Sequence, residues 1–211
     1  MNRKEIKMRA KEYAFNKKWA LWKPVLTFGV ITMIVSFAVG LLAGIFGLDP
    51  DGNAFNALNS LVSIASIPLT VAELLYVIKT IKGEAIDLKE IILSRYKLIL
   101  PIILTSCVVG LLIGLGTIAL IIPGILLALR FSQVNYVLAE GKKEDVSDLK
   151  ALSTSSNLMK GHYGEYFMFH LSFIGWYLLC AVTLGIASIW VMPYVTVSQY
   201  YFYEELKKQS N

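Results

Sequence analysis

The fold is decided by residues 24–48, which read PVLTFGVITMIVSFAVGLLAGIFGL and contain no charged side chain. Such a stretch is typical of a transmembrane helix, since about 20 helical residues cross a hydrocarbon core of about 30 Å. The stretch is too long for the apolar part of a signal peptide, and no small-residue cleavage site follows it. We therefore expect it to remain in the protein as the first membrane span.

The rest of the chain shares this apolar character. Of its 211 residues, 56% are hydrophobic and 17% are charged, and the mean hydropathy is +0.60, above the usual range of soluble domains. Each apolar block must be helical, because unsatisfied backbone amides are costly in hydrocarbon. The sequence predicts an all-α membrane protein with a single membrane domain, residues 1–211, and six transmembrane helices arranged as three hairpins. The predicted spans are residues 24–47, 57–78, 98–117, 119–139, 166–186 and 188–203.

The last two pairs of spans are short. Residues 98–139 and 166–203 can each cross the core twice only if the turn between the helices is very tight, since a helix rises about 1.5 Å per residue. Re-entrant hairpins that do not fully cross the bilayer are the alternative, and the sequence leaves it open.

The basic residues predict the orientation. Of the 20 Lys and Arg residues, 19 lie in segments 1–23, 79–97 and 140–165 and in the tail after Tyr203, whereas the connections near residues 48–56, 116–123 and 186–190 carry none. The twentieth, Arg130, lies inside a predicted span. This alternation follows the positive-inside rule. It predicts that the amino and carboxyl termini are both cytoplasmic.

Three units with weak mutual similarity divide the chain, approximately at residues 1–83, 84–141 and 142–211. Lys18-Trp19 precedes Pro24 by the same spacing with which Arg95-Tyr96 precedes Pro101. A cytoplasmic amphipathic helix is expected before each hairpin, where it would lie in the membrane interface and bind anionic headgroups. Solvated loop helices would show the same pattern. The apolar positions are Ile6, Ala10 and Tyr13, then Leu88, Ile91 and Ile92, then Leu149, Leu152 and Met159.

Glu73 and Arg130 are the two formally charged residues deep within the predicted spans. A charge at the bilayer centre costs at least about 2.5–3.5 kcal/mol, so such residues face a bundle interior or a cavity and often pair. Glu73 and Arg130 follow Pro68 and Pro123 at similar spacing, which indicates similar depth. We expect the two charges to be neighbours, either as a structural ion pair or as part of a ligand site.

Other chemistry finds little support in the sequence. Cys107 and Cys180 lie within apolar stretches, and His162 and His170 have no further ligand at metal-binding spacing. We therefore expect no metal and no cofactor. No nucleophile, zinc-protease or phosphate-loop motif appears, so we expect no enzyme. Nucleic acid is not an expected partner, because the basic residues are separated by apolar blocks.

Six stretches carry a family resemblance: MNRKEIKMRAK at 1–11, IPGILLALRFS at 122–132, ALSTSSNLMKG at 151–161, FIGW at 173–176, WVMPY at 190–194 and FYEEL at 202–206. Together they resemble the bacterial integral membrane family catalogued as domain of unknown function 975. The Pro-Gly-Ile and serine-to-Lys-Gly patterns are also similar to the membrane domain of some glycerophosphodiester phosphodiesterases, whose chemistry belongs to a separate soluble domain. The resemblance implies motif positions of unknown role at Pro123, Gly124, Arg130, Ser155, Lys160 and Gly161.

The leading functional hypothesis is a non-enzymatic transporter or permeation unit for a small or amphiphilic ligand. The alternative is an accessory or protective interaction protein, for example one that confers immunity to membrane-active peptides. Transport predicts a cavity that reaches Glu73 or Arg130, whereas the interaction role predicts a dry bundle. The expected partners are membrane lipids, with a second copy of the chain or another membrane protein as further candidates. The family resemblance implies the bacterial cytoplasmic membrane as the location.

Overall fold

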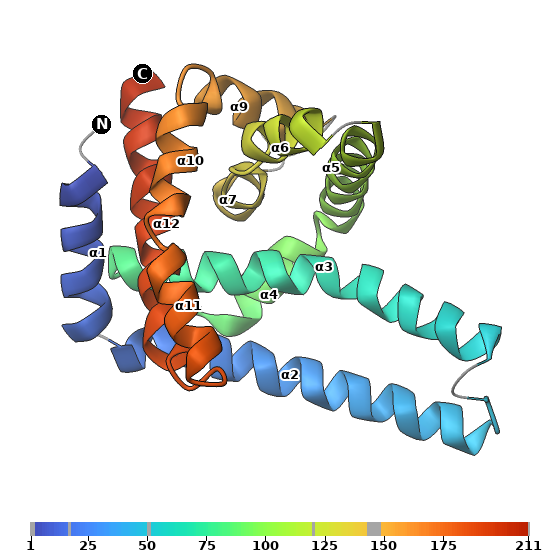
Figure 1. The fold of residues 1–211 in the computed structure, drawn as a ribbon. Helices are drawn as coiled ribbons and strands as arrows, with labels where there is room; N and C mark the ends of the chain where they lie inside the picture. The colour runs from blue at the N-terminus through green and yellow to red at the C-terminus, as the bar shows by residue number, and fades with distance from the viewer. Residues whose placement is uncertain (1–2, 17, 50–51, 120, 143–148, 211) are drawn as a thin grey trace.

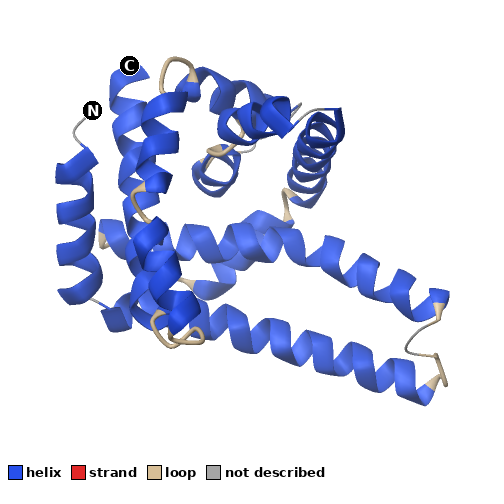
Figure 2. Cartoon of the chain, viewed as in Figure 1, coloured by secondary structure: helices blue, strands red, loops and turns tan. Residues whose placement is uncertain are grey.

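The described part of the chain is mainly helical (Figure 1 and Figure 2). The computed structural model describes residues 3–16, 18–49, 52–119, 121–142 and 149–210, and these ranges contain helices, turns and loops but no strand. The predicted all-α class is therefore confirmed. The helices are α1 (Arg3–Asn16), α2 (Lys18–Ile45), α3 (Asn53–Lys82), α4 (Leu88–Tyr96), α5 (Ile99–Ala119), α6 (Ile121–Arg130), α7 (Val134–Glu140), α9 (Lys150–Met159), α10 (Tyr163–Leu171), α11 (Ile174–Val182) and α12 (Ser188–Ser210).

Five helical segments within the described ranges are long and apolar enough to cross a membrane. The prediction of a helical membrane protein is confirmed at this level, but six spans are not. The sixth predicted span lies in α12, which does not meet the same criterion and ends in the charged sequence around Glu204 and Lys208. The five segments are Trp19–Ile45, Asn53–Lys82, Ile99–Ile118, Ile122–Glu140 and Tyr163–Val182.

Helices α2 and α3 pack together and project from the rest of the molecule as an arm (Figure 1). Phe28 of α2 is buried with Leu69 and Ala72 of α3 near the base of the arm. Beyond that point α2 is apolar and exposed, and Ile45 near its end is 76% exposed. An exposed apolar surface on a helix of this length is what hydrocarbon chains would cover.

Helix α12 lies at the centre of the main core. It contacts α1, α2, α9 and α11, and Tyr200, Phe202 and Leu206 are almost fully buried along it. Helix α1 runs antiparallel to it, so that the start of α1 and the end of α12 lie on the same side of the molecule (Figure 1). The Arg9 guanidinium accordingly lies over the Tyr201 ring, 5.0 Å from its centroid.

Two of the predicted spans are bent. Helix α6 ends at Arg130 and α7 begins at Val134, while α10 ends at Leu171 and α11 begins at Ile174. At each break a serine hydroxyl, that of Ser132 or Ser172, donates to the backbone carbonyl three residues earlier. Such bonds compete with the helical backbone pattern and bend helices.

One contact does not fit six full crossings. The indole Nε1 of Trp22 donates to the Ile189 carbonyl oxygen over 2.9 Å. Six crossings would place Trp22 at the cytoplasmic boundary and the 186–190 turn outside, roughly 30 Å apart. The two groups are in contact, which differs from the separation that six full crossings predict.

Helices α1, α4 and α9 form where amphipathic helices are expected, but protein covers much of their apolar faces. Ile6 and Ala10 of α1 are buried in the core centred on α12. Ile91 of α4 is buried with α2 and α3, and Met159 of α9 is buried in the main core. Because these faces pack on other helices, the sequence pattern reflects tertiary contacts as much as a membrane surface. The start of the third amphipathic segment falls within residues 143–148, outside the described residues.

Candidate functional site

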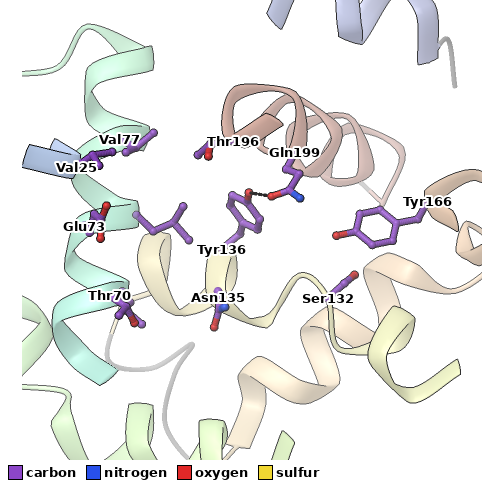
Figure 3. Close-up of a pocket in the computed structure, with 12 residues that line it drawn as sticks. Val25, Thr70, Glu73, Val77, Ser132, Asn135, Tyr136, Tyr166, Thr196 and Gln199 are labelled. Carbon is purple, nitrogen blue, oxygen red and sulfur yellow. Dashed lines mark hydrogen bonds between the residues drawn. The ribbon is translucent and has the colours of Figure 1, made fainter. Parts of the chain in front are cut away.

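A polar cavity of about 540 Å³ lies where α3, α7, α10 and α12 approach one another (Figure 3). Glu73 lies on one side of the cavity, and Tyr136 and Gln199 lie opposite it. The volume is in the ordinary range for small-molecule sites. The lining residues are Val25, Thr70, Val71, Glu73, Leu74, Val77, Ser132, Asn135, Tyr136, Tyr166, Thr196 and Gln199.

Glu73 supplies the charge of this cavity. Among the described residues that line it, Glu73 is the one with a formally charged side chain, and none is a Lys or Arg. The carboxylate is partly buried and forms no hydrogen bond or ion pair with another residue of the described part of the chain. The cavity therefore offers an acceptor-only group to a ligand that brings its own positive charge or hydrogen-bond donors.

A short relay of hydrogen bonds orders the side of the cavity opposite Glu73. The Tyr136 hydroxyl donates to Oε1 of Gln199 over 3.2 Å, and Nε2 of Gln199 lies 3.1 Å from Nε2 of His170. Nδ1 of His170 lies 3.2 Å from the Tyr166 carbonyl oxygen. A neutral His170 that carries its proton on Nδ1 satisfies all of these contacts, so the relay holds Gln199 in one orientation.

Polar side chains extend from the cavity along α3 towards the tip of the arm. Thr70 and Glu73 line the cavity, and Asn59, Ser63 and Ser66 continue at intervals of three or four residues, which places them on one helix face. The hydroxyls of Ser63, Ser66 and Thr70 donate to carbonyls of α3 itself. Asn59 and Ser63 are exposed, so this polar stripe (Asn59, Ser63, Ser66 and Thr70) has a surface available to water or a partner.

Arg130 is not part of this cavity, and within the described residues it forms no ion pair with Glu73. Nε of Arg130 donates to the Ser156 hydroxyl over 2.7 Å, and the Arg130 carbonyl accepts from the buried Ser155 hydroxyl over 3.0 Å. The predicted pair is therefore wrong. Similar distance from a proline predicts similar depth but not the helix face, and Arg130 faces α9.

At the remaining family-motif positions, the residues fit the local helix packing and backbone conformation. A Cβ atom on Gly124 would clash with Thr117, including its backbone Cα at 2.8 Å, so Gly124 allows α6 to approach α5 closely. Pro123, in the first turn of α6, precedes it. Lys160 caps the end of α9, and Gly161 adopts φ +85° in the turn to α10, a conformation that favours glycine.

Two charged residues that join helices were missed in the sequence. Arg95 is buried, and its Nη1 donates to the carbonyls of Leu138, Ala139 and Gly141 at 2.7–3.2 Å, which caps the end of α7 from α4. Burial lowers the pKa of Arg95, but guanidinium remains protonated at neutral pH because its ordinary value is so high. Its place among other basic residues gave no signal of burial.

Glu140 is the second residue that the sequence analysis missed. Its carboxylate accepts from Lys82 of α3 over 2.6 Å and from Lys207 of α12 over 2.9 Å. It therefore connects the ends of three helices, α3, α7 and α12. The sequence did offer a signal that Glu140 could pair with lysines. Glu140 ends an apolar block, and the neighbouring apolar blocks are also followed by lysines.

A comparison with known protein families gives a match in the second part of the chain. The family model described as Protein of unknown function (DUF975) matches residues 112–210, which include Arg130, Ser155 and Gly161 but not Glu73. No curated protein and no solved structure matches the chain. The family resemblance noted in the sequence is thus confirmed over residues 112–210, which match the model of the family described as Protein of unknown function (DUF975).

Proposed function

We propose that this protein is a non-enzymatic membrane protein that binds a small cationic solute at Glu73 and allows it to move across the membrane. The observation that carries the proposal is a lone carboxylate in a polar cavity with no lysine or arginine among its described lining residues. A carboxylate left in such a place is costly unless water or a cation compensates it. An organic ammonium group would do so.

The neutral lining residues suit the same ligand. Tyr136 and Tyr166 bring aromatic rings to the cavity, which can attract a cation through their faces. Asn135 and Thr196 add oxygen acceptors for N–H groups. An organic amine is therefore favoured over an anion, which would face Glu73 without a compensating positive charge.

The polar stripe on α3 supports a route between the cavity and the opposite side of the membrane. Asn59 and Glu73 are 14 positions apart, which corresponds to about 21 Å along a helix, most of a hydrocarbon core. Polar groups over that length allow a hydrated solute to exchange its water contacts for protein contacts step by step. A helix bundle without a water-filled path would gain nothing from polar groups at these positions.

His170 and Ser132, beside the cavity, are engaged with other groups of the protein, which supports binding over catalysis. Both ring nitrogens of His170 have partners, at Gln199 and at the Tyr166 carbonyl. The Ser132 hydroxyl is engaged with Gln133 and with the Leu129 carbonyl. Neither is arranged as a nucleophile with its own base.

The membrane setting is part of the proposal. The distribution of Lys and Arg supports cytoplasmic amino and carboxyl termini in a bacterial cytoplasmic membrane, with anionic headgroups near the basic segments. In this orientation Lys82 marks the cytoplasmic end of α3, and Glu73 lies about 14 Å further along the helix. The cavity would then be nearer the inner leaflet.

The test is thermal unfolding of the detergent-purified protein with methylammonium, tetramethylammonium or spermidine at constant ionic strength. Binding of a cation to the folded state at 100 times its Kd adds about 2.7 kcal/mol, which raises the Tm by several degrees. Glu73→Gln should abolish the increase. Glu205→Gln, which removes an equal charge from a carboxylate outside the cavity, should retain it.

Two results would contradict the proposal. If the wild-type Tm is unchanged by all three cations, the cation class is wrong, and if Glu73→Gln responds like the wild type, the site is elsewhere. A cation that binds is then tested for flux in proteoliposomes. Binding without flux would favour the accessory role over transport.

A further inference from the structure

The turn between α11 and α12 exposes an unusually apolar tip. Val182 is 81% exposed and Leu184 is 94% exposed, and Ile186 beyond them is also exposed. Helix α11 itself has no buried residue. A tip of this composition would be unstable in water, and it resembles a segment that enters a lipid phase.

The depth of this tip is set by its contact with α2. The bond from Trp22 Nε1 to the Ile189 carbonyl ties the start of α12 to the entry of the first span. Beside this bond, Trp19, Trp22, Leu26, Ile189 and Trp190 line an apolar groove of about 370 Å³. Tryptophans gather at membrane–water interfaces, so three of them around one groove indicate the level of the headgroups.

The far ends of the same helices meet charged groups. Nζ of Lys7 donates to the carbonyl and hydroxyl of Ser172, at the break between α10 and α11, over 3.2 and 3.0 Å. Near the other end of α12, Lys207 pairs with Glu140. A lysine at the centre of the bilayer would cost about 2.5–3.5 kcal/mol, so Ser172 cannot lie at mid-membrane.

The length of α11 agrees with this placement. Its residues Ile174–Val182 correspond to about 14 Å of helix, less than half of a hydrocarbon core of about 30 Å. Starting from the level of Lys7, α11 can enter one leaflet but cannot cross both.

We propose that residues 174–192 form a re-entrant hairpin that enters the inner leaflet from the cytoplasmic side and returns without crossing. The tryptophan groove at its base holds an acyl chain of an inner-leaflet phospholipid. Its walls are almost wholly apolar, and the exposed Lys23 follows Trp22, where it can attract an anionic headgroup. This inference does not depend on cation binding at Glu73.

The experiment uses single cysteines in the full-length protein with Cys107→Ala and Cys180→Ala. Leu184→Cys and Ile186→Cys are the test variants. Asn53→Cys at the tip of the arm and Lys208→Cys in the tail are the controls for the two sides. A membrane-impermeant maleimide is applied to intact cells, to opened membranes and to detergent-solubilised protein, and each variant must elute as a single folded species.

We expect Asn53→Cys to react in intact cells and Lys208→Cys only in opened membranes. Leu184→Cys and Ile186→Cys should not react in intact cells or in opened membranes, and they should react only in detergent. Labelling of the test positions in intact cells together with Asn53→Cys would show a full crossing and overturn the proposal. Labelling in opened membranes together with Lys208→Cys would place the tip in the cytoplasm and overturn insertion.

The lipid groove is tested with phospholipids brominated on the acyl chain, which quench nearby tryptophans. In vesicles that contain them, the wild type should lose a larger fraction of its fluorescence than the Trp19→Phe/Trp22→Phe/Trp190→Phe variant, whose remaining tryptophan is Trp176. Equal fractional quenching of the two proteins would show that the groove is not in contact with acyl chains.

Discussion

At the scale of single residues, Gly124 has the most demanding position among the family-motif glycines. Its missing side chain lets the backbone of α6 lie against Thr117 of α5, where a Cβ atom would come within 2.8 Å of the Thr117 nitrogen and Cα. Backbone atoms cannot rotate away as a flexible side chain can. The two helices would have to separate.

We therefore expect Gly124→Ala to destabilise the protein by about 1–3 kcal/mol, the usual cost of overpacking. The measurement is the Tm of the purified protein in one detergent. Gly110→Ala on α5 is the matched control, because nothing lies within 4 Å of a Cβ atom at that position. The control should be neutral or slightly stabilised through helix propensity. Equal Tm values for the two variants would contradict the close approach of α5 and α6.

At the scale of helices, Arg95 shows how a short amphipathic element can act as a structural part. From α4 it reaches three carbonyls at and beyond the end of α7, where the backbone of a helix lacks partners. A cation is also favoured at a helix carboxyl end by the helix dipole. Helix α4 is thus anchored by both its buried Ile91 and its arginine.

Arg95→Gln should lower stability by about 1.5–3 kcal/mol, since hydrogen bonds from a charged donor to buried carbonyls are lost. The matched control is Arg130→Gln, which removes a single exposed bond to Ser156 and should cost less than about 1 kcal/mol. The two variants carry the same chemical change, so a comparison of their Tm values isolates the capping of α7. A larger loss for Arg130→Gln would contradict this assignment.

At the scale of the whole molecule, the arm and the core have different surroundings. Helix α2 of the arm is apolar and exposed along most of its length, whereas α1 and the end of α12 carry charged groups beside the core. In the proposed orientation, the base of the arm, where Trp22 lies, is the boundary between membrane and cytoplasm. The core would sit at the inner surface, with α5 and the α11–α12 tip reaching into the bilayer.

Reporter fusions after Asn53, Lys142 and Lys208 test this orientation. We expect an outside signal after Asn53 and inside signals after Lys142 and Lys208, because the basic residues near the last two should remain cytoplasmic. Alkaline phosphatase and a fluorescent protein that folds in the cytoplasm provide opposite readouts at each site. An inside signal after Asn53 would show that the arm does not cross the membrane.

The sequence by itself determined the class of the protein and the positions of most of its helices. Apolar runs such as residues 24–48 require helix in hydrocarbon whatever their neighbours are, since the backbone must satisfy its own hydrogen bonds. The helices before each apolar pair were also predictable from their periodicity. Glu73 was found in the sequence as a cavity candidate, because a buried charge is costly in any arrangement.

Only the tertiary structure decided which groups meet. Arg130 and Glu73 were expected to pair from their depths, but their side chains face different helices, and depth carries no information about the helix face. The burial of Arg95 and the contact between Trp22 and Ile189 depend on chain segments far apart in sequence. The hydrophobicity of a segment depends only on the residues within it, so it can be read from the sequence. These contacts depend on the angles and positions at which helices cross, which are set by the packing of all the helices together.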